Sequence, residues 1–134
     1  MEIIYENQHS FSKDELQRLF RSVNWASGEY PEKLVDAMKN YSTVFAARDN
    51  GNLIGLISVM DDKTMTAYIH YLLVDPKYQG LGIGKRLVDK IKDAYKDYLR
   101  IALVSYKKEV GFYESCGFKI SDDLVPMSIT ELYN

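Results

Sequence analysis

A glycine-rich loop that follows an apolar run constrains the fold of this chain more than any other feature. The apolar residues 72–74 stop at Asp75-Pro76, glycines occupy alternate positions between 80 and 84, and a helical pattern then begins. This order predicts a strand, a tight loop and a helix. Backbone N–H groups in such a loop lie at the positive end of the helix dipole, where a phosphate is stabilised without a cationic side chain. An ordinary strand-to-helix connection is the alternative, because short glycine patterns recur by chance.

The composition is that of a soluble globular protein. The chain has 134 residues, which favours one domain spanning residues 1–134. Hydrophobic residues make up 46% and charged residues 27%, both ordinary values. A net charge of −2 does not suggest a nucleic-acid footprint, and no apolar run approaches the roughly 20 residues that span a bilayer. We therefore expect no nucleic-acid or membrane partner.

Cysteine and histidine are scarce, and their number and spacing give expectations about the cellular compartment and about metal binding. The single cysteine, Cys116, excludes an intrachain disulfide and fits a reducing cytosol. The first residues also lack a signal-peptide pattern, so we expect a cytoplasmic protein. Two histidines and one cysteine lie far apart in the sequence, and we therefore expect no metal site.

The first half of the chain is predicted to form a strand, two helices and an antiparallel meander. A short strand at 2–5 precedes a helix with capping-box spacing at Ser12 and Glu15, and Pro31 begins a second helix. Strands at 43–48 and 53–60 flank the hairpin signal Asn50-Gly51, and a third strand spans 65–74.

In the third strand, successive side chains are expected on opposite faces until near its end. Thr66, Tyr68 and His70 are expected on one face, with Ala67, Ile69 and Tyr71 on the other. The alternation is lost at 72–74, and either a fully buried strand end or a bulge gives this pattern.

The second half is predicted to contain a strand–helix–strand unit. A helix after the glycines leads to a strand at 99–105, which we expect to lie parallel to the third strand. A short helix at 107–116 ends at Gly117, and two last strands are expected at 118–120 and 125–132. A meander followed by such a unit predicts a mixed α/β fold.

Two motifs in this chain resemble those of a known family. Residues 74–84, with Gln79 before the glycines, look like the acetyl-CoA signature of the GNAT superfamily of N-acetyltransferases, Q/R-x-x-G-x-G/A. Residues 112–118, FYESCGF, resemble its second signature, a Phe-Tyr followed by Gly-Phe. The order of elements is similar over essentially the whole chain. The resemblance implies the GNAT fold, a mixed central sheet of six to seven strands flanked by about four helices.

The resemblance also implies acetyl-CoA as the acetyl donor. Its pantetheine arm would lie along the strand end, where a backbone N–H at or beside Leu73 would stabilise the thioester oxygen, and its diphosphate would lie on the loop amides. Lys85 and Arg86 either add charge near the phosphates or form a solvated helix face. In many members an asparagine side chain contacts the cofactor arm where this chain has Tyr106, so this side-chain contact is absent or replaced here. The expected cofactor-binding residues are Leu72, Leu73, Val74, Gln79, Gly80, Leu81, Gly82, Ile83, Gly84, Lys85, Tyr106 and Tyr113.

Two catalytic residues follow from the resemblance. Tyr113 matches the family's general acid, and a phenol with a pKa near 10 stays protonated at neutral pH. Many members have a carboxylate base where this chain has Tyr68. His70 lies two residues further on, its usual pKa of about 6.5 suits proton removal, and the arylalkylamine acetyltransferases are similar in placing a histidine there. Proton loss to water and a structural role for His70 are the alternatives.

The implied activity is transfer of acetyl from acetyl-CoA to a primary amine by direct attack in a ternary complex. Trp25, Tyr30, Tyr68 and His70 are the expected acceptor-binding residues, forming an aromatic wall for an arylalkylamine or a polyamine. Peptide and lysine amines are further possible acceptors. The alternative for Trp25 and Tyr30 is that both pack on the core. A catalytically weak acyl-CoA-binding sensor or interaction module is the alternative, because the carboxylate base and the asparagine are missing. Small members often dimerise, which keeps a homodimer open.

Overall fold

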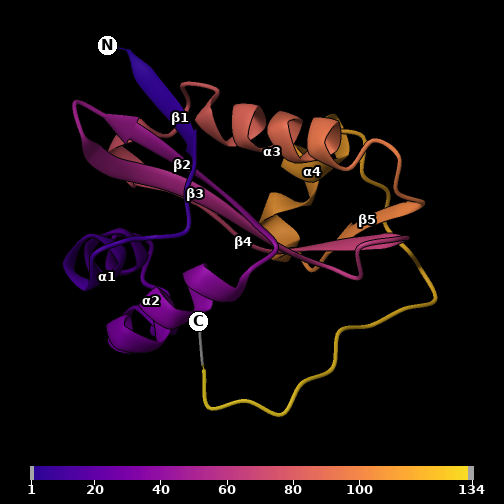
Figure 1. Ribbon diagram of the computed structural model, residues 1–134. Coiled ribbons are helices and arrows are strands. Elements are labelled where there is room, and N and C mark those ends of the chain that lie inside the picture. Colours follow the sequence, from indigo (N-terminus) through magenta and orange to yellow (C-terminus); the bar gives the residue numbers. More distant parts are fainter. Residues whose placement is uncertain (1, 133–134) are drawn as a thin grey trace.

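One mixed sheet organises the computed structural model, which describes residues 2–132 (Figure 1). Its strands are β1 (Ile3–Asn7), β2 (Thr43–Asp49), β3 (Asn52–Asp61), β4 (Thr66–Val74) and β5 (Arg100–Leu103). They lie in chain order from β1 to β5. Neighbours from β1 to β4 pair antiparallel, whereas β5 pairs parallel with β4. The predicted parallel pair is therefore confirmed.

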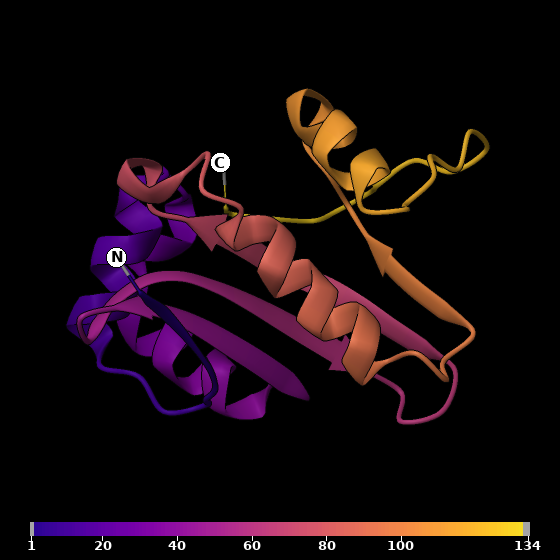
Figure 2. The ribbon, with the colours of Figure 1, turned by 90° about the horizontal axis from the view of Figure 1, so that it is seen from above.

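Helices cover both faces of this sheet (Figures 1 and 2). The α-helices are α1 (Lys13–Ser22), α2 (Pro31–Asn40), α3 (Ile83–Ala94) and α4 (Val110–Ser115). Short 3-10 turns are η1 (Ala26–Glu29), η2 (Pro76–Tyr78) and η3 (Lys107–Glu109). One apolar cluster lies between α1, α2 and the sheet, and a second lies between α3 and the opposite face. The mixed α/β fold with about four helices is confirmed.

Local sequence signals explain where these elements begin. Ser12 and Glu15 form the predicted capping box: the Glu15 N–H donates to Ser12 Oγ at 3.2 Å, and the Ser12 N–H donates to Glu15 Oε2 at 2.9 Å. Pro31 occupies the first turn of α2, where its missing N–H needs no partner. Asn50 and Gly51 have φ values of 51° and 83°, as a tight hairpin between β2 and β3 requires.

A bulge at His70 changes the faces that β4 presents. Tyr71 pairs with Ser58 and Ile69 with Val59, so His70 is the extra residue. Ile69 packs in the cluster beneath α3, whereas Tyr71 belongs to the cluster beneath α1 and α2. The prediction that Ala67, Ile69 and Tyr71 share one face is therefore wrong at Tyr71. A bulge, rather than a fully buried strand end, accounts for the lost alternation.

The last two predicted strands do not form. Residues 118–120 and 125–132 carry no strand, and residues 2–132 contain a five-stranded sheet rather than one of six to seven strands. After α4 the chain runs as an exposed, extended segment outside the sheet (Figure 1). An extended segment becomes a strand only when its backbone groups pair with a neighbour, and no strand of the described part of the chain pairs with this one.

The capping box gives a stability test. We expect Ser12→Ala to lower the free energy of unfolding by about 1 kcal/mol, because it removes the acceptor for the Glu15 N–H. Urea unfolding followed by circular dichroism measures this change. Ser10→Ala removes a neighbouring exposed hydroxyl outside the cap and should leave the unfolding midpoint unchanged. Equal midpoints for the two variants would contradict the role of the cap.

Candidate active site

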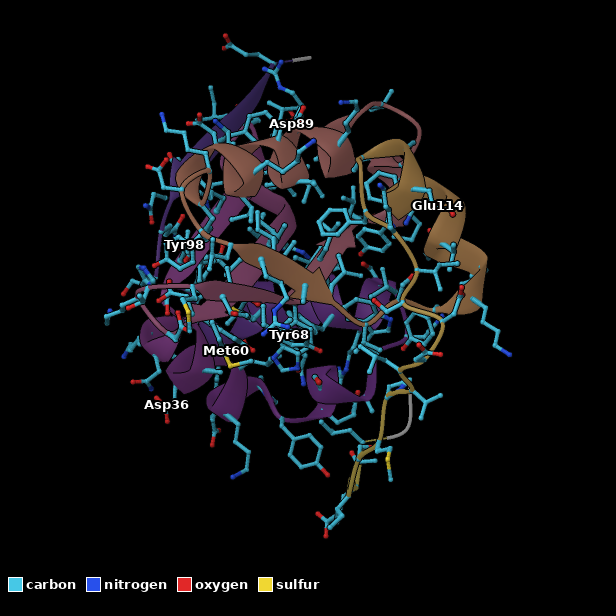
Figure 3. All side chains as sticks on the ribbon, turned by 90° about the vertical axis from the view of Figure 1, so that its right-hand side faces the viewer. Asp36, Met60, Tyr68, Asp89, Tyr98 and Glu114 are labelled. Atoms are coloured by element: carbon cyan, nitrogen blue, oxygen red, sulfur yellow. The ribbon has the colours of Figure 1, made fainter. Side chains whose placement is uncertain are left out.

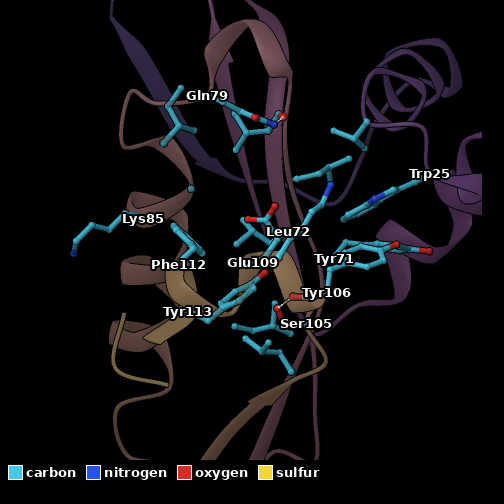
Figure 4. A pocket seen from close by; sticks show the side chains of 18 of the residues that line it. Trp25, Tyr71, Leu72, Gln79, Lys85, Ser105, Tyr106, Glu109, Phe112 and Tyr113 are labelled. Atoms are coloured by element: carbon cyan, nitrogen blue, oxygen red, sulfur yellow. Dashed lines mark hydrogen bonds between the residues drawn. The ribbon is translucent and has the colours of Figure 1, made fainter. Parts of the chain in front are cut away.

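A pocket opens where β4 extends beyond the end of its pairing with β5, its parallel neighbour. The pairing of β4 with β5 stops at Ile69 and Leu103, so residues 70–74 have no partner strand on that side among the residues that the structure describes. The pocket there has a volume of about 1170 Å³. It is lined by the end of β4, the glycine loop, the residues after β5, and α4 (Figure 4). The predicted strand-end residues Leu72, Leu73 and Val74 all border it, although the Leu73 side chain is buried in the core beneath α1 and α2.

The glycine loop turns unpaired backbone amides toward this pocket. Gly80 and Gly82 each have a φ of 81°, and Gly82 caps α3 without a side-chain hydrogen bond. The Gln79 N–H donates to the Pro76 carbonyl at 3.3 Å, and the first backbone bond of α3 is from the Arg86 N–H to the Gly82 carbonyl, which leaves the amides of residues 80–85 free within residues 2–132. Free amides at the positive end of a helix are suited to bind a phosphate.

Gly84 lies in a different environment from the two glycines before it. A Cβ at this position would lie 3.4 Å from the ring of Phe112, an ordinary van der Waals contact, so α4 lies directly against the first turn of α3. The pocket, which Gly84 also lines, is thereby joined to the second sequence motif, which carries Phe112 and Tyr113.

The cationic side chains of this helix lie away from the pocket. Lys85 lines the pocket with its backbone, but its side chain extends outward (Figure 4) and its Nζ lies 3.4 Å from Asp89. The Arg86 guanidinium lies over the ring of Tyr5, 5.5 Å from its centroid. Leu81 is 56% exposed and is not among the described residues lining this pocket. A phosphate held by the glycine loop would therefore be bound by its backbone rather than by the cations of α3.

Tyr113 faces the pocket from α4 (Figure 4). Burial, with a smaller contribution from the carboxylate of Glu109 one helical turn earlier, raises the pKa of Tyr113 to about 12. Within residues 2–132 its hydroxyl has no hydrogen-bond partner. The phenol therefore stays protonated at neutral pH and is free to donate, as its predicted role requires.

His70 lies at the pocket within a group of aromatic side chains. Its ring stacks on Tyr71 with 4.2 Å between centroids, and its Nδ1 lies 2.5 Å from the hydroxyl of Tyr41. Burial lowers the pKa of His70 below its usual 6.5, so the imidazole is neutral at pH 7. Burial also raises the pKa of Tyr41, which keeps that phenol protonated.

A buried hydrogen-bond network fixes this aromatic group. The Tyr71 hydroxyl lies 2.7 Å from Ser27 Oγ in η1, and the Tyr71 N–H donates to Ser58 Oγ on β3 at 3.2 Å. Tyr41, Tyr71 and Ser27 were not predicted from the sequence. They lie far apart along the chain, and only the bulge in β4 brings the Tyr71 ring to this face. Tyr41 follows a helix with no motif around it, so no sequence signal could have found it.

Only some of the predicted acceptor-binding residues line the pocket. Trp25 and Tyr68 line the pocket, and Tyr68 lies on the side of the sheet that faces α1 and α2 (Figure 3). Tyr30 is 42% exposed and is not among the described residues lining the pocket. Tyr106 lines it as predicted, and its ring centroid lies 6.3 Å from that of Trp25.

Other residues reach the pocket without having been predicted. Most of them follow β5 or precede Tyr113, where a strand, a 3-10 turn and α4 succeed one another. They include Ser105, Lys108, Glu109 and Phe112. Helical spacing could have indicated Glu109, which lies four residues before Tyr113.

Comparison with known proteins identifies the family to which this chain belongs. Residues 9–118 match the acetyltransferase (GNAT) family. The chloroplastic GCN5-related N-acetyltransferase 2 of Arabidopsis thaliana is 31% identical over 140 residues, covering 88% of this chain and 54% of that protein. The chloroplastic GCN5-related N-acetyltransferase 3 of the same plant is 38% identical over 118 residues, covering 87% and 47%. The chain thus spans about half the length of these relatives.

Solved structures agree with this assignment. A GNAT family acetyltransferase from Streptococcus pneumoniae has a TM-score of 0.83 at 27% identity, covering 97% of this chain and 98% of that one. The fold and these relatives together define the family. The chain belongs to the acetyltransferase (GNAT) family, whose members use acetyl-CoA as the acetyl donor, and the predicted family is confirmed.

Among residues 2–132, no group of three or more His, Cys, Asp or Glu side chains is arranged to hold a metal ion. None of the helices in that range is both long and apolar enough to cross a membrane.

The amide loop gives a matched pair of glycine variants. Gly82 and Gly51 have φ values of 81° and 83°, and an added Cβ would meet no atom within 4 Å at either position. Alanine should therefore cost each fold a similar amount, about 1 kcal/mol. Only Gly82→Ala should also raise the Kd for CoA, by about tenfold, because it alone disturbs the loop amides. Equal Kd values for the two variants by titration calorimetry would contradict the loop as a phosphate site.

Proposed function

We propose that this chain is an N-acetyltransferase that transfers acetyl from acetyl-CoA to a primary amine, by direct attack while both are bound. One observation carries the proposal: a single pocket joins the free amides of the glycine loop, the unpaired end of β4 and the protonated phenol of Tyr113. When bound, acetyl-CoA would supply the thioester carbon that the amine attacks.

His70 is proposed to take the proton that the amine must lose. An alkylamine with a pKa near 10.4 is charged at neutral pH and cannot attack. The imidazole is neutral at that pH, because burial lowers its pKa. When Nδ1–H donates to the Tyr41 hydroxyl, Nε2 is the nitrogen left to accept a proton. Tyr41 thus acts as a positioning residue that holds the ring and its tautomer.

Tyr113 is proposed to protonate the departing sulfur. The hydroxyl has no competing partner within residues 2–132, and a pKa of about 12 keeps its proton in place until a thiolate needs it. A backbone N–H at or beside Leu73, on the end of β4 that β5 leaves unpaired, is proposed to donate to the thioester oxygen.

The acceptor is proposed to be a primary amine on an apolar or aromatic body. Trp25, Tyr68 and His70 line the pocket, and Tyr71 stacks behind His70. Aromatic faces attract a cation, which would hold the ammonium form of the amine before it loses its proton. Arylalkylamines and polyamines fit this description, whereas the exposed Tyr30 contributes nothing to the pocket.

Removing the Tyr113 hydroxyl tests the acid. We expect Tyr113→Phe to lower kcat at least about 100-fold, while the Kd for CoA changes less than about twofold, because the loop amides stay in place. Thiol release from acetyl-CoA and calorimetry measure the two quantities. Tyr98→Phe removes a phenol outside the pocket and should change neither. An unchanged kcat would remove Tyr113 from the mechanism, and CoA binding without thiol release across a panel of amines would favour a sensor.

The pH dependence tests the base. Because burial places the pKa of His70 below 6.5, kcat/KM should fall on the acid side only below that pH, as the imidazole becomes protonated. In His70→Gln this limb should disappear, and the rate should be low at neutral pH and recover as rising pH deprotonates the amine itself. A profile of the same shape in both proteins would contradict His70 as the base and favour water.

A further inference from the structure

The glycine loop does not fix its own conformation. The amides of residues 80–85 make no backbone hydrogen bond within residues 2–132, and Gly80 and Gly82 are both exposed. A segment without such bonds is ordered only through its two ends, and disorder in it must be removed when a ligand binds. One end of the loop is helix α3. The other end, residues 75–79, therefore decides how well the free amides are ordered.

Tyr78 ties this end of the loop to the sheet. It lies in η2, and its hydroxyl donates to Asp49 Oδ2 at 2.6 Å. Its ring packs against the apolar cluster beneath α3. The Asp49 carboxylate, by accepting this bond, raises the pKa of Tyr78, so the phenol keeps the proton that it donates. A phenol bonded to a carboxylate forms one of the stronger hydrogen bonds in a protein.

Asp49 is a fixed anchor because β2 is an interior strand. It pairs with Ile3 on β1 and with Asn52 on β3, so its backbone is held from both sides. Asp49 also lies 29 residues before Tyr78 in the sequence. The bond therefore joins the loop to a part of the sheet that is distant along the chain.

The other side-chain bonds at this end of the loop are local. Asp75 Oδ1 accepts from the Lys77 N–H at 2.9 Å, and Gln79 Nε2 donates to the Val74 carbonyl at 3.0 Å. Both bonds join residues of one short stretch, and they move with it. Only the Tyr78 bond ties a loop side chain to another strand among the bonds of the described residues.

We propose that the bond between Tyr78 and Asp49 holds the glycine loop in its phosphate-binding conformation, which makes Tyr78 a positioning residue for the diphosphate of the donor. The inference rests on the proposed function, because that reaction supplies acetyl-CoA as the donor. Tyr78 acts through the loop, since its hydroxyl is engaged by Asp49. Without the bond, only a fraction of the chains would present the ordered amides, and the affinity would fall by that fraction.

A second bond of the same kind offers a matched control. Tyr95, at the end of α3, donates to Asp61 Oδ2, also at 2.6 Å. Neither residue is among the described residues lining the pocket. Tyr95 is more buried than Tyr78, and its hydroxyl also lies 2.7 Å from Thr43 Oγ1. Its loss should therefore destabilise the fold at least as much, so a difference in ligand affinity between the two variants reports on the loop.

Titration calorimetry with CoA tests the positioning role. Tyr78→Phe should raise the Kd for CoA about tenfold, whereas Tyr95→Phe should change it less than about twofold. Asp49→Ala should raise the Kd as much as Tyr78→Phe, and the double variant no more than either alone, because all three lack the same bond. In Tyr78→Phe the KM for acetyl-CoA should rise with the Kd, while kcat at saturation falls less than about twofold, since the bond serves binding rather than proton transfer.

The outcomes separate this role from the proposed function. A native chain that does not bind CoA would overturn both. A native chain that binds CoA, with an unchanged Kd in Tyr78→Phe, would overturn only the positioning role. So would an equal rise in Tyr95→Phe, or a double variant in which the effects of the two substitutions multiply. Circular dichroism at the titration temperature shows that each variant is folded.

Discussion

Strand β4 takes part in two kinds of pairing, and the candidate active site exists because one of them stops early. On one side β4 pairs with β3 from Ala67 to Val74, apart from the bulge at His70, and this pairing holds it in the antiparallel sheet. On the other side it pairs with β5 only as far as Ile69. The backbone beyond that point is rigidly held yet open, a combination that an ordinary loop does not provide. The glycine loop and α4 then place their groups against this open stretch.

The bulge at His70 decides which side chains reach the pocket. It places His70 and Tyr71 on the same side of the sheet, where their rings stack, and the buried bonds to Ser27 and Ser58 keep Tyr71 there. Burial then has opposite consequences for the two proposed proton-transfer groups. It lowers the pKa of His70 and raises that of Tyr113, so both are uncharged at neutral pH. One is then able to accept a proton and the other to donate one.

Within residues 2–132, β5 is an edge strand of the same sheet. Leu99 and Val104, which flank this strand, are both exposed. Val104 also lines the pocket, so the edge of the sheet and the wall of the candidate site meet at this residue.

Local signals in the sequence determined most of the elements and the position of the site. The capping box at Ser12, Pro31, the Asn50-Gly51 hairpin and the glycine loop act within a few residues of themselves, so they were predictable without any tertiary contact. The two family motifs indicated the candidate pocket for the same reason, because each motif is a short stretch of sequence, and residues of both line that pocket.

Only the tertiary structure decided what depends on residues distant in sequence. The bulge in β4 exists because Ser58 and Val59 pair with Tyr71 and Ile69, which the sequence of β4 alone does not encode. Tyr41 and Ser27 join the site through such contacts, and Tyr30 is left out of it. The pattern at 125–132 predicted a strand, but a strand needs a partner for its backbone as well as an alternating sequence, and that partner is a property of the assembled fold.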